Sequence, residues 1–581
     1  MKTMKNFLSM AALALVGALM TGCSSDDNIT DQPQHPVNKN NLVTLTTTVG
    51  LDGGATTRAL TADGKKTFAE NDQIAVIYTK NGGTVTKAVS EKLISTDIAS
   101  GSKSATFTVT LDDPDKTKNV TYIYPASMAG ETDVDYTKLN SQDGTLVSLA
   151  ANLDYCTESG AWDGENLPTL TLENQLAILA ITLKNEAGTS DITSGTTKLT
   201  VGDGTNTYAV TRETGAGPIY VAIRPTTSVN ISIEATSGGN GYCKTLTTKT
   251  YEASNGYQVS WKMTHATLLS TIASNYTAQD GETLYGKLGS NVKISIADGA
   301  TVTLKDVTIN GVNSYSYEWA GITCAGDATI TLEGANTVKG FNLEYPGIYV
   351  PEDKTLTIEG EGSLNASNNG RATGIGGGLG MHCGDIVING GNITATGAIY
   401  AAGIGGGEGD DETVIRCGKI TINGGTVTAT GGKWGAGIGC GDYGYSDDIT
   451  INGGTVEATG GNSAAGIGSG GDSGSCGAIT ISGGTVTATG GNYAAGIGSG
   501  ESASYGVIDI SGGTVTATGG KWAAGIGGGS SNGASGSITI TSGVTQVIAT
   551  KGSGAPNSIG SGDSGAAISV DIEAGANVTQ N

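Results

Sequence analysis

The residue types that most often carry out catalysis are sparse in this chain and follow no catalytic spacing. Its three histidines, His35, His265 and His382, lie in no recognisable motif. Cleavage of a glycan or another polymer needs paired carboxylates, or a metal with a strong base, on one face of the fold. Glu457 is the single acid in the repeated threonine segments of the C-terminal half. The sequence therefore predicts a protein without enzymatic activity, with no catalytic residues and no metal site. A polysaccharide-degrading enzyme is the less favoured alternative.

Acidic residues do gather in three loop segments, and carboxylate oxygens are ligands that Ca²⁺ accepts. The segments are Glu408 to Glu412, Asp447-Asp448 and Gly471-Asp472. None of them matches the calcium-binding nonapeptide of repeat toxins. We expect solvated turns and no cofactor, with calcium as the alternative.

Aromatic residues recur at one place in a repeated segment, four residues before an isoleucine that marks each repeat. On successive coils of a stack, such rings are separated by multiples of about 4.8 Å. They could stack on the sugar rings of an extended glycan, because Tyr and Trp combine a large apolar area with a polar group. The alternative is that the rings cover a hydrophobic corner of the fold. The candidate glycan-binding residues are Tyr400, Trp434, Tyr493 and Trp522, with Ser463 interrupting the series.

The elements that position these rings come from a repeat of about 29 residues with the unit I-T-I-x-G-G-T-V-T-A-T-G-G-x-x-A-A-G-I-G-x-G. Alternate apolar positions lie on one face of each strand, and glycine suits the corners, where φ is positive. One unit cannot bury a core, whereas a stack can. The pattern predicts a right-handed parallel β-helix; a β-propeller is the weaker alternative because its blades need about 40 residues. The marker isoleucines are Ile322, Ile348, Ile375, Ile404, Ile438, Ile467, Ile497, Ile526 and Ile559.

Cysteines recur in the same repeat, at Cys383, Cys417 and Cys476. Cys383 and Cys417 fall in adjacent coils, close enough in principle for a disulfide; a column of unpaired thiols is the alternative. Apart from Cys23 the chain has seven cysteines, and an odd number excludes a complete disulfide framework.

The middle of the chain, from about residue 41 to residue 265, consists of short alternating segments separated by Gly, Asn and Asp. This pattern predicts antiparallel β-sandwiches. The segments Phe68–Val76, Ile123–Ser127, Gln142–Thr145 and Gly217–Ala222 resemble, in that order, the fimbrillin family of Bacteroidales, whose members form type V pili. Asn71 stands where the family has glycine. The resemblance implies two tandem transthyretin-like sandwiches that divide near Leu167.

The tetrapeptide Thr56-Thr57-Arg58-Ala59 resembles the processing site of the same family. The resemblance implies proteolytic cutting after Arg58, removal of the first strand, and a groove that accepts a donor strand from another fimbrial subunit. Backbone hydrogen bonds supply the affinity of such strand addition. An uncut domain that keeps its own strand is the alternative. Because about 300 residues follow the sandwiches, we expect an accessory or tip component and not a shaft subunit.

The N-terminus has the features of an export signal. Lys2 and Lys5 precede an apolar stretch, Phe7 to Met20, that is too short to span a bilayer. The following residues, up to Cys23, resemble a bacterial lipobox. The resemblance implies cleavage before Cys23, acylation of its thiol and amine with chains such as palmitate, and anchoring in the outer membrane. The acidic stretch Ser24–Asp27 resembles a signal for surface exposure.

Composition supports an exported role. The net charge is −23, which argues against nucleic acid as a partner because its phosphates need a basic surface. We therefore expect an all-β surface lipoprotein that acts as an adhesin or accessory pilus component and binds a host or dietary glycan. A purely structural spacer is the competing role. The expected parts are a signal peptide (1–22), a linker (23–40), two sandwiches (41–166 and 167–265), a connector (266–290) and the β-helix (291–581).

Overall fold

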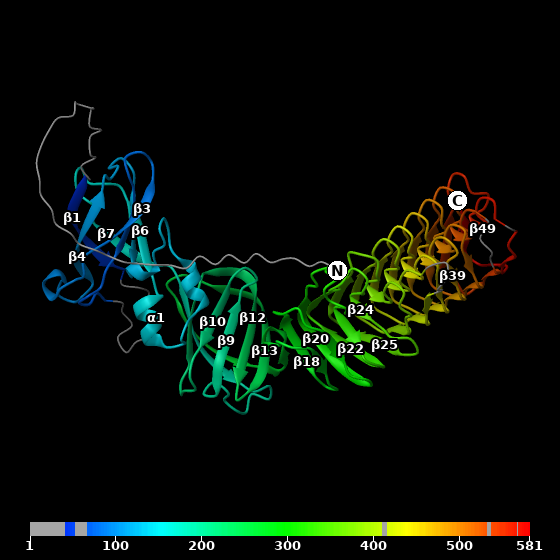
Figure 1. The fold of residues 1–581 in the computed structure, drawn as a ribbon, viewed down its shortest axis with the longest axis horizontal. Coiled ribbons are helices and arrows are strands. Elements are labelled where there is room, and N and C mark those ends of the chain that lie inside the picture. Colours follow the sequence, from blue (N-terminus) through cyan, green and yellow to red (C-terminus); the bar gives the residue numbers. More distant parts are fainter. Residues whose placement is uncertain (1–40, 53–66, 410–414, 532–535, 566) are drawn as a thin grey trace, which may run out of the picture.

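The computed structural model describes residues 41–52, 67–409, 415–531, 536–565 and 567–581. Two β-sandwich regions are followed by an elongated stack of coils (Figure 1). The predicted all-β fold class, with sandwiches followed by a parallel β-helix, is confirmed. The predicted lipidation site Cys23 and processing site Arg58 lie outside the described residues.

The first sandwich region contains a seven-stranded sheet in the order β3-β2-β5-β6-β7-β1-β4. Alternate residues of β2 face two different cores: Val76 packs with the first core and Ile77 with the second. The single α-helix among the described residues, α1 (Leu146–Asn152), also contributes to the second core through Leu149. The strands are β1 (Leu42–Leu51), β2 (Ala75–Thr79), β3 (Val85–Val89), β4 (Ser104–Asp112), β5 (Val120–Tyr124), β6 (Cys156–Gly160) and β7 (Leu170–Asn174).

The second sandwich region pairs a five-stranded sheet, β10-β9-β12-β13-β15, with a three-stranded sheet, β11-β8-β14. The apolar run Ala177–Leu183 in β8 supplies the centre of its core. The strands are β8 (Ala177–Lys184), β9 (Thr196–Gly202), β10 (Thr207–Thr211), β11 (Ile219–Ile223), β12 (Thr226–Ser237), β13 (Asn240–Tyr251), β14 (Gly256–Lys262) and β15 (Thr264–His265).

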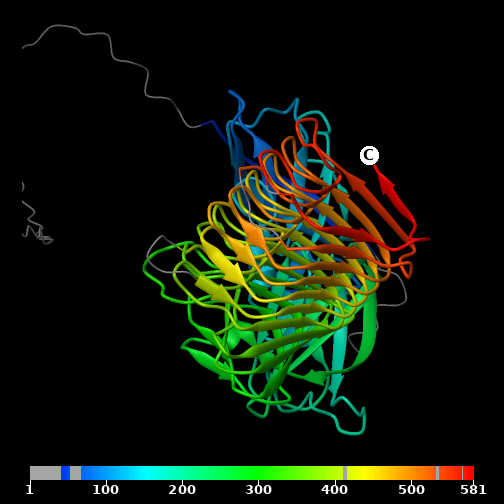
Figure 2. The same ribbon diagram turned by 90° about the vertical axis from the view of Figure 1, so that its right-hand side faces the viewer.

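The C-terminal stack is built from strands that all pair in parallel with the same part of the next coil. A typical coil contains β32 (Ile420–Ile422), β33 (Thr426–Thr430) and β34 (Ile438–Gly439). Figure 2 shows successive coils following the same path. The stack starts with β16 (Thr267–Leu268), β17 (Tyr276–Ala278) and β18 (Thr283–Lys287), inside the range that the sequence analysis assigned to a connector. The other strands of the first coils are β19 (Ile294–Ile296), β20 (Ala300–Ile309), β21 (Ile322–Cys324), β22 (Ala328–Glu333), β23 (Ala335–Lys339), β25 (Thr355–Gly360), β26 (Ser363–Ser367) and β29 (Asn392–Thr396).

The marker isoleucines pair with one another in register from Ile322 to Ile559, as predicted. All of them are buried. Each of the last seven marker isoleucines is followed by a glycine, the first being Gly376 and the last Gly560. These glycines have φ between 126° and 139°. A side chain at Gly468 would overlap the carbonyl oxygen of Gly498 in the next coil. Glycine is therefore required there both for the backbone conformation and for the close approach of the coils.

Candidate functional site

The four candidate aromatic residues lie one above another along an edge of the β-helix, just before the marker isoleucines. We call Tyr400, Trp434, Tyr493 and Trp522 the ring column. Each ring is half-buried, so the column belongs neither to the closed core nor to the fully exposed surface. Ser463, which occupies the same position in the coil between Trp434 and Tyr493, is buried.

A second column of residues runs beside the rings; each of its members stands four residues after a marker isoleucine. The backbone N–H of such a residue donates to the backbone carbonyl of the ring residue in the preceding coil. The N–H of Asp442 donates to the Tyr400 carbonyl at 2.8 Å, and that of Asp563 donates to the Trp522 carbonyl at 2.8 Å. Several members of the second column carry carboxyl groups. We call Glu408, Asp442, Glu501 and Asp563 the carboxylate column.

Side chains of the two columns complement each other across the coils. Arg371 occupies the ring position one coil before Tyr400, donates to the carboxylate of Glu408 and places its guanidinium carbon 5.1 Å from the Tyr400 ring centroid. The hydroxyl of Ser463 donates to Glu501 at 2.7 Å. Polar groups thus lie between and beside the aromatic rings, in one strip along this edge of the β-helix.

Small residues make room for the larger rings. A Cβ atom on Gly471 would lie 3.0 Å from Cε3 of Trp434, and one on Gly554 would overlap the Trp522 indole. Each indole therefore leans across the coil edge onto the backbone of the next coil. These glycines are the packing partners of the rings, a role that the repeat pattern does not indicate.

Two lysines stand over the indoles. Lys433 Nζ lies 4.8 Å from the Trp434 ring centroid, and Lys521 Nζ lies 4.7 Å from that of Trp522. Both lysines are exposed, where a cation–π contact contributes only about 0.5–1 kcal/mol. A ligand that stacks on the indole could displace the lysine at low cost.

Asp442 has the most unusual electrostatic environment of the strip. It is 6% exposed, and its Oδ1 atom has no hydrogen-bond partner among the described residues. Burial, and then the charges of Asp472 and Glu408, raise the pKa of Asp442 to about 7. The group therefore holds its proton up to neutral pH, where it is able to donate as well as accept a hydrogen bond.

The histidines and the acidic loop residues that the sequence singles out make contacts that belong to the fold. Among the described residues, no group of three or more His, Cys, Asp or Glu side chains is placed to hold a metal ion. His382 Nδ1 accepts from the Arg416 N–H at 3.0 Å, and His265 packs edge-on against Tyr242. Asp448 Oδ1 accepts from the Ala478 N–H at 2.9 Å and so holds a turn. Residues 410–412 of the first acidic loop, and His35, lie outside the described part of the chain.

Cys383 and Cys417 are in contact. Their Sγ atoms are 2.8 Å apart, both residues are buried, and their backbones form a parallel bridge. The hydrogen bond to Cys383, together with burial, raises the pKa of Cys417. Cys476 lies two coils further along the same column, beyond Ser446.

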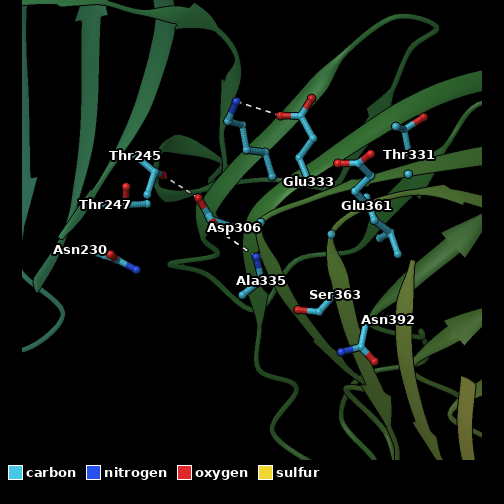
Figure 3. A pocket seen from close by; sticks show the side chains of 15 residues that line it. Asn230, Thr245, Thr247, Asp306, Thr331, Glu333, Ala335, Glu361, Ser363 and Asn392 are labelled. Atoms are coloured by element: carbon cyan, nitrogen blue, oxygen red, sulfur yellow. Dashed lines mark hydrogen bonds and ion pairs between the residues drawn. The ribbon is translucent and has the colours of Figure 1, made fainter. Parts of the chain in front are cut away.

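A cleft of about 920 Å³, lined by several polar side chains, lies where the second sandwich meets the first coils of the β-helix (Figure 3). One wall comes from β12 and β13 and the other from β20, β22, β23, β25, β26 and β29. At its base the Thr245 hydroxyl donates to Asp306 Oδ2 at 2.6 Å, and the Ala335 N–H donates to Asp306 Oδ1 at 3.0 Å. The sequence could not indicate this cleft, because its walls come from two modules and no motif spans them.

An apolar contact behind the cleft joins the two modules. Cys243 of β13 packs with Ala266, Leu268 and Tyr285, and the Tyr285 hydroxyl donates to the Lys244 carbonyl at 3.3 Å. Buried apolar packing combined with these hydrogen bonds fixes the walls relative to each other.

Comparison with known proteins finds a family model described as "Beta helix repeat" that matches residues 386–408, 420–442, 449–471, 479–501 and 508–530. No curated protein matches the chain significantly. Among the described residues, none of the helices has both the length and the apolar character needed to cross a membrane.

Solved structures similar to the chain include a cell adhesion protein from Bacteroides fragilis, at 13% identity over 37% of this chain and 91% of that one, with a TM-score of 0.23. A fimbrial assembly protein from Parabacteroides distasonis is 10% identical over 38% and 90%, with a TM-score of 0.23. The tip fimbrial protein Mfa3 from Porphyromonas gingivalis is 11% identical over 36% and 81%, with a TM-score of 0.17.

Proposed function

We propose that this protein is a surface adhesin or accessory fimbrial component whose β-helix binds a glycan along the ring column. The observation that carries the proposal is the column of half-buried rings, interrupted at Ser463, with carboxyl groups beside it on several of the coils. Rings offer flat apolar faces to sugars, and carboxyl groups accept hydrogen bonds from hydroxyls. Repetition at about 4.8 Å per coil suits an extended chain better than a single sugar.

The test is to replace both indoles, Trp434→Ala and Trp522→Ala, in the full chain and to measure binding on a glycan array. We expect at least a tenfold loss of affinity, because stacking of a nucleic-acid base on an aromatic side chain contributes on the order of 1–3 kcal/mol and two stacking rings are removed. The matched control is Tyr315→Ala, which removes an exposed ring outside the column. Unchanged binding in the double variant would rule out the ring column as the site.

The proposed setting is the outer membrane, with the chain anchored through acylated Cys23 and exposed at the cell surface. In this arrangement the sandwiches hold the β-helix away from the membrane. Mass spectrometry of the mature N-terminus, isolated from the native cells, tests cleavage before Cys23 and cutting after Arg58 together.

Association with other fimbrial subunits is supported by the position of β1. This strand lies between β4, with which it is antiparallel, and β7, with which it is parallel. It buries Thr47, Val49 and Leu51 against the sheet. Cutting after Arg58 would permit β1 to leave, and a strand from another subunit could fill the vacated position.

The competing role is a rigid spacer without a ligand. It is favoured by the single continuous core from Leu269 to Ile559, which makes the stack one stiff body. Adhesion of cells that carry the Trp434→Ala, Trp522→Ala variant distinguishes the two roles. Adhesion is unchanged if the β-helix is a spacer and is lost if it is the adhesive part.

A further inference from the structure

The cleft between the second sandwich and the β-helix has unused polar groups on both walls. Thr247 on the sandwich wall, and Glu361, Ser363 and Asn392 on the β-helix wall, line it. The side chains of these four residues make no hydrogen bond to any other described residue. Polar groups that converge on a preformed concave surface are the usual sign of a binding site.

Other groups in the cleft are already committed to the structure. Asp306 has φ of 51° and uses both carboxylate oxygens to hold Thr245 and the Ala335 backbone. Lys305 forms an ion pair with Glu333 at 2.8 Å. The committed groups form a rigid base, and Figure 3 shows the free groups lying around it. A ligand would therefore meet a base that needs little reorganisation, which favours affinity, whereas the free side chains around it become ordered on binding.

The free groups also follow the geometry of the β-helix. Ala335, Ser363 and Asn392 pair in register on successive coils, and Thr426 continues the row beyond the cleft. Hydroxyl and amide groups thus repeat at about 4.8 Å from the base of the cleft outward. A chain that enters the cleft by its end would leave it along this row.

Charge restricts the ligand. Lys305 is the single cation among the residues that line the cleft, against the carboxylates of Asp306, Glu333 and Glu361. Lys305 is paired with Glu333, so no cation of the cleft balances the carboxylates of Asp306 and Glu361. Asp306 already accepts two hydrogen bonds, and Glu361 is the carboxylate left free to accept more. An acidic ligand would meet repulsion, whereas hydroxyl groups could donate to Glu361 and exchange hydrogen bonds with Ser363, Asn392 and Thr247.

We propose that this junction cleft binds the non-acidic end of a glycan, as a site separate from the ring column. Its ligands are neutral sugars whose hydroxyl groups bind Glu361, Ser363 and Asn392. The proposal does not depend on the ring column, and each site can fail without the other.

The test uses the full chain and isothermal titration calorimetry with neutral disaccharides containing glucose, galactose, mannose, fucose or N-acetylglucosamine, and with a galacturonic acid disaccharide. We expect at least one neutral probe to bind and the acidic probe to bind at least tenfold more weakly. The double variant Glu361→Ala, Asn392→Ala should lose at least tenfold in affinity with an unchanged melting temperature. Filling the cleft with Ser363→Tyr should abolish binding.

The matched control is Asn365→Ala. Asn365 is an exposed residue of β26, two positions after Ser363 and outside the cleft, so this variant should bind the probes like the unaltered chain. Trp434→Ala with Trp522→Ala should also retain disaccharide binding. The proposal is overturned if no neutral probe binds, if the acidic probe binds equally well, or if the Asn365 variant loses as much affinity as the cleft variants. Loss of disaccharide binding in the indole variant would assign the binding to the ring column and overturn it as well.

Discussion

The indole of Trp522 rests on the backbone of Gly554, in the next coil, so closely that even a methyl group on Gly554 would overlap the ring. The glycine thereby determines where the outermost ring of the column lies. Similar contact between Trp434 and Gly471 shows that the position of a ring depends on the coil that follows it.

Gly554→Ala should therefore destabilise the protein by about 1–3 kcal/mol, because overpacking forces the indole from its position. In a Trp522→Ala background the same change should cost less than about 0.5 kcal/mol, since the overlapping ring is absent. A double-mutant cycle by chemical unfolding measures the difference. Equal costs in the two backgrounds would show that the ring does not rest on this glycine.

Gly468→Ala should destabilise the β-helix by at least about 2 kcal/mol. Gly468 has φ of 136° and faces the Gly498 carbonyl of the next coil, so alanine is strained in both respects. The matched control is Gly215→Ala, because a side chain there meets no atom within 4 Å; we expect a change within about 0.5 kcal/mol. Urea unfolding of both variants provides the comparison.

Asp442 should make stability depend on pH. Its pKa in the folded protein is about 7, above the ordinary value of 3.8, so the folded state binds the proton more tightly than the unfolded state. Stability contributed by the protonated group is then lost as the pH rises from about 4 to about 7, by at most about 4 kcal/mol. Asp442→Asn should remove this dependence and raise the melting temperature at pH 8. A melting temperature at pH 8 equal to or lower than that of the unaltered chain would contradict the assignment.

Cys383 and Cys417 should oxidise to a disulfide outside the cell, with two electrons and two protons passing to dioxygen or to the disulfide of a thiol oxidoreductase. The contact between their Sγ atoms, at 2.8 Å, places them in reach of each other. Such a bond closes a loop of 34 residues and should stabilise the fold by about 4 kcal/mol.

Peptide mapping without reductant should detect the cross-linked pair, and reduction should lower the melting temperature of the unaltered chain. Neither effect is expected in a Cys383→Ser, Cys417→Ser variant. Cys324→Ser serves as the control, because Cys324 is buried in the same core away from this pair. Two free thiols in protein secreted under oxidising conditions would refute the prediction.

The sequence by itself determined the β-helix, because its information is local and repeated. Residues equivalent to Ile420, Val427 and Ile438 recur at intervals of about 29 residues, and each repetition places an apolar residue over its counterpart. The parity of the strands also determined which residues face the core. The column of aromatic positions followed directly from the same period.

Tertiary structure alone decided what surrounds those positions. The sequence left open whether the rings face solvent or core, and the structure places them half-buried between the two. This depends on partners such as Gly471, whose small size leaves room for Trp434 of the preceding coil to lean onto it. No periodic pattern records such diagonal contacts.

The junction cleft depended most completely on tertiary structure. Thr245 and Asp306 are 61 residues apart in the chain and belong to different modules, yet they share the hydrogen bond at its base. Spacing along a chain predicts which residues share a face of one element, whereas the angle between two modules is set by packing, here around Tyr285 and Leu268. For that reason the repeat could be read from the residues in order, and the cleft only from the folded molecule.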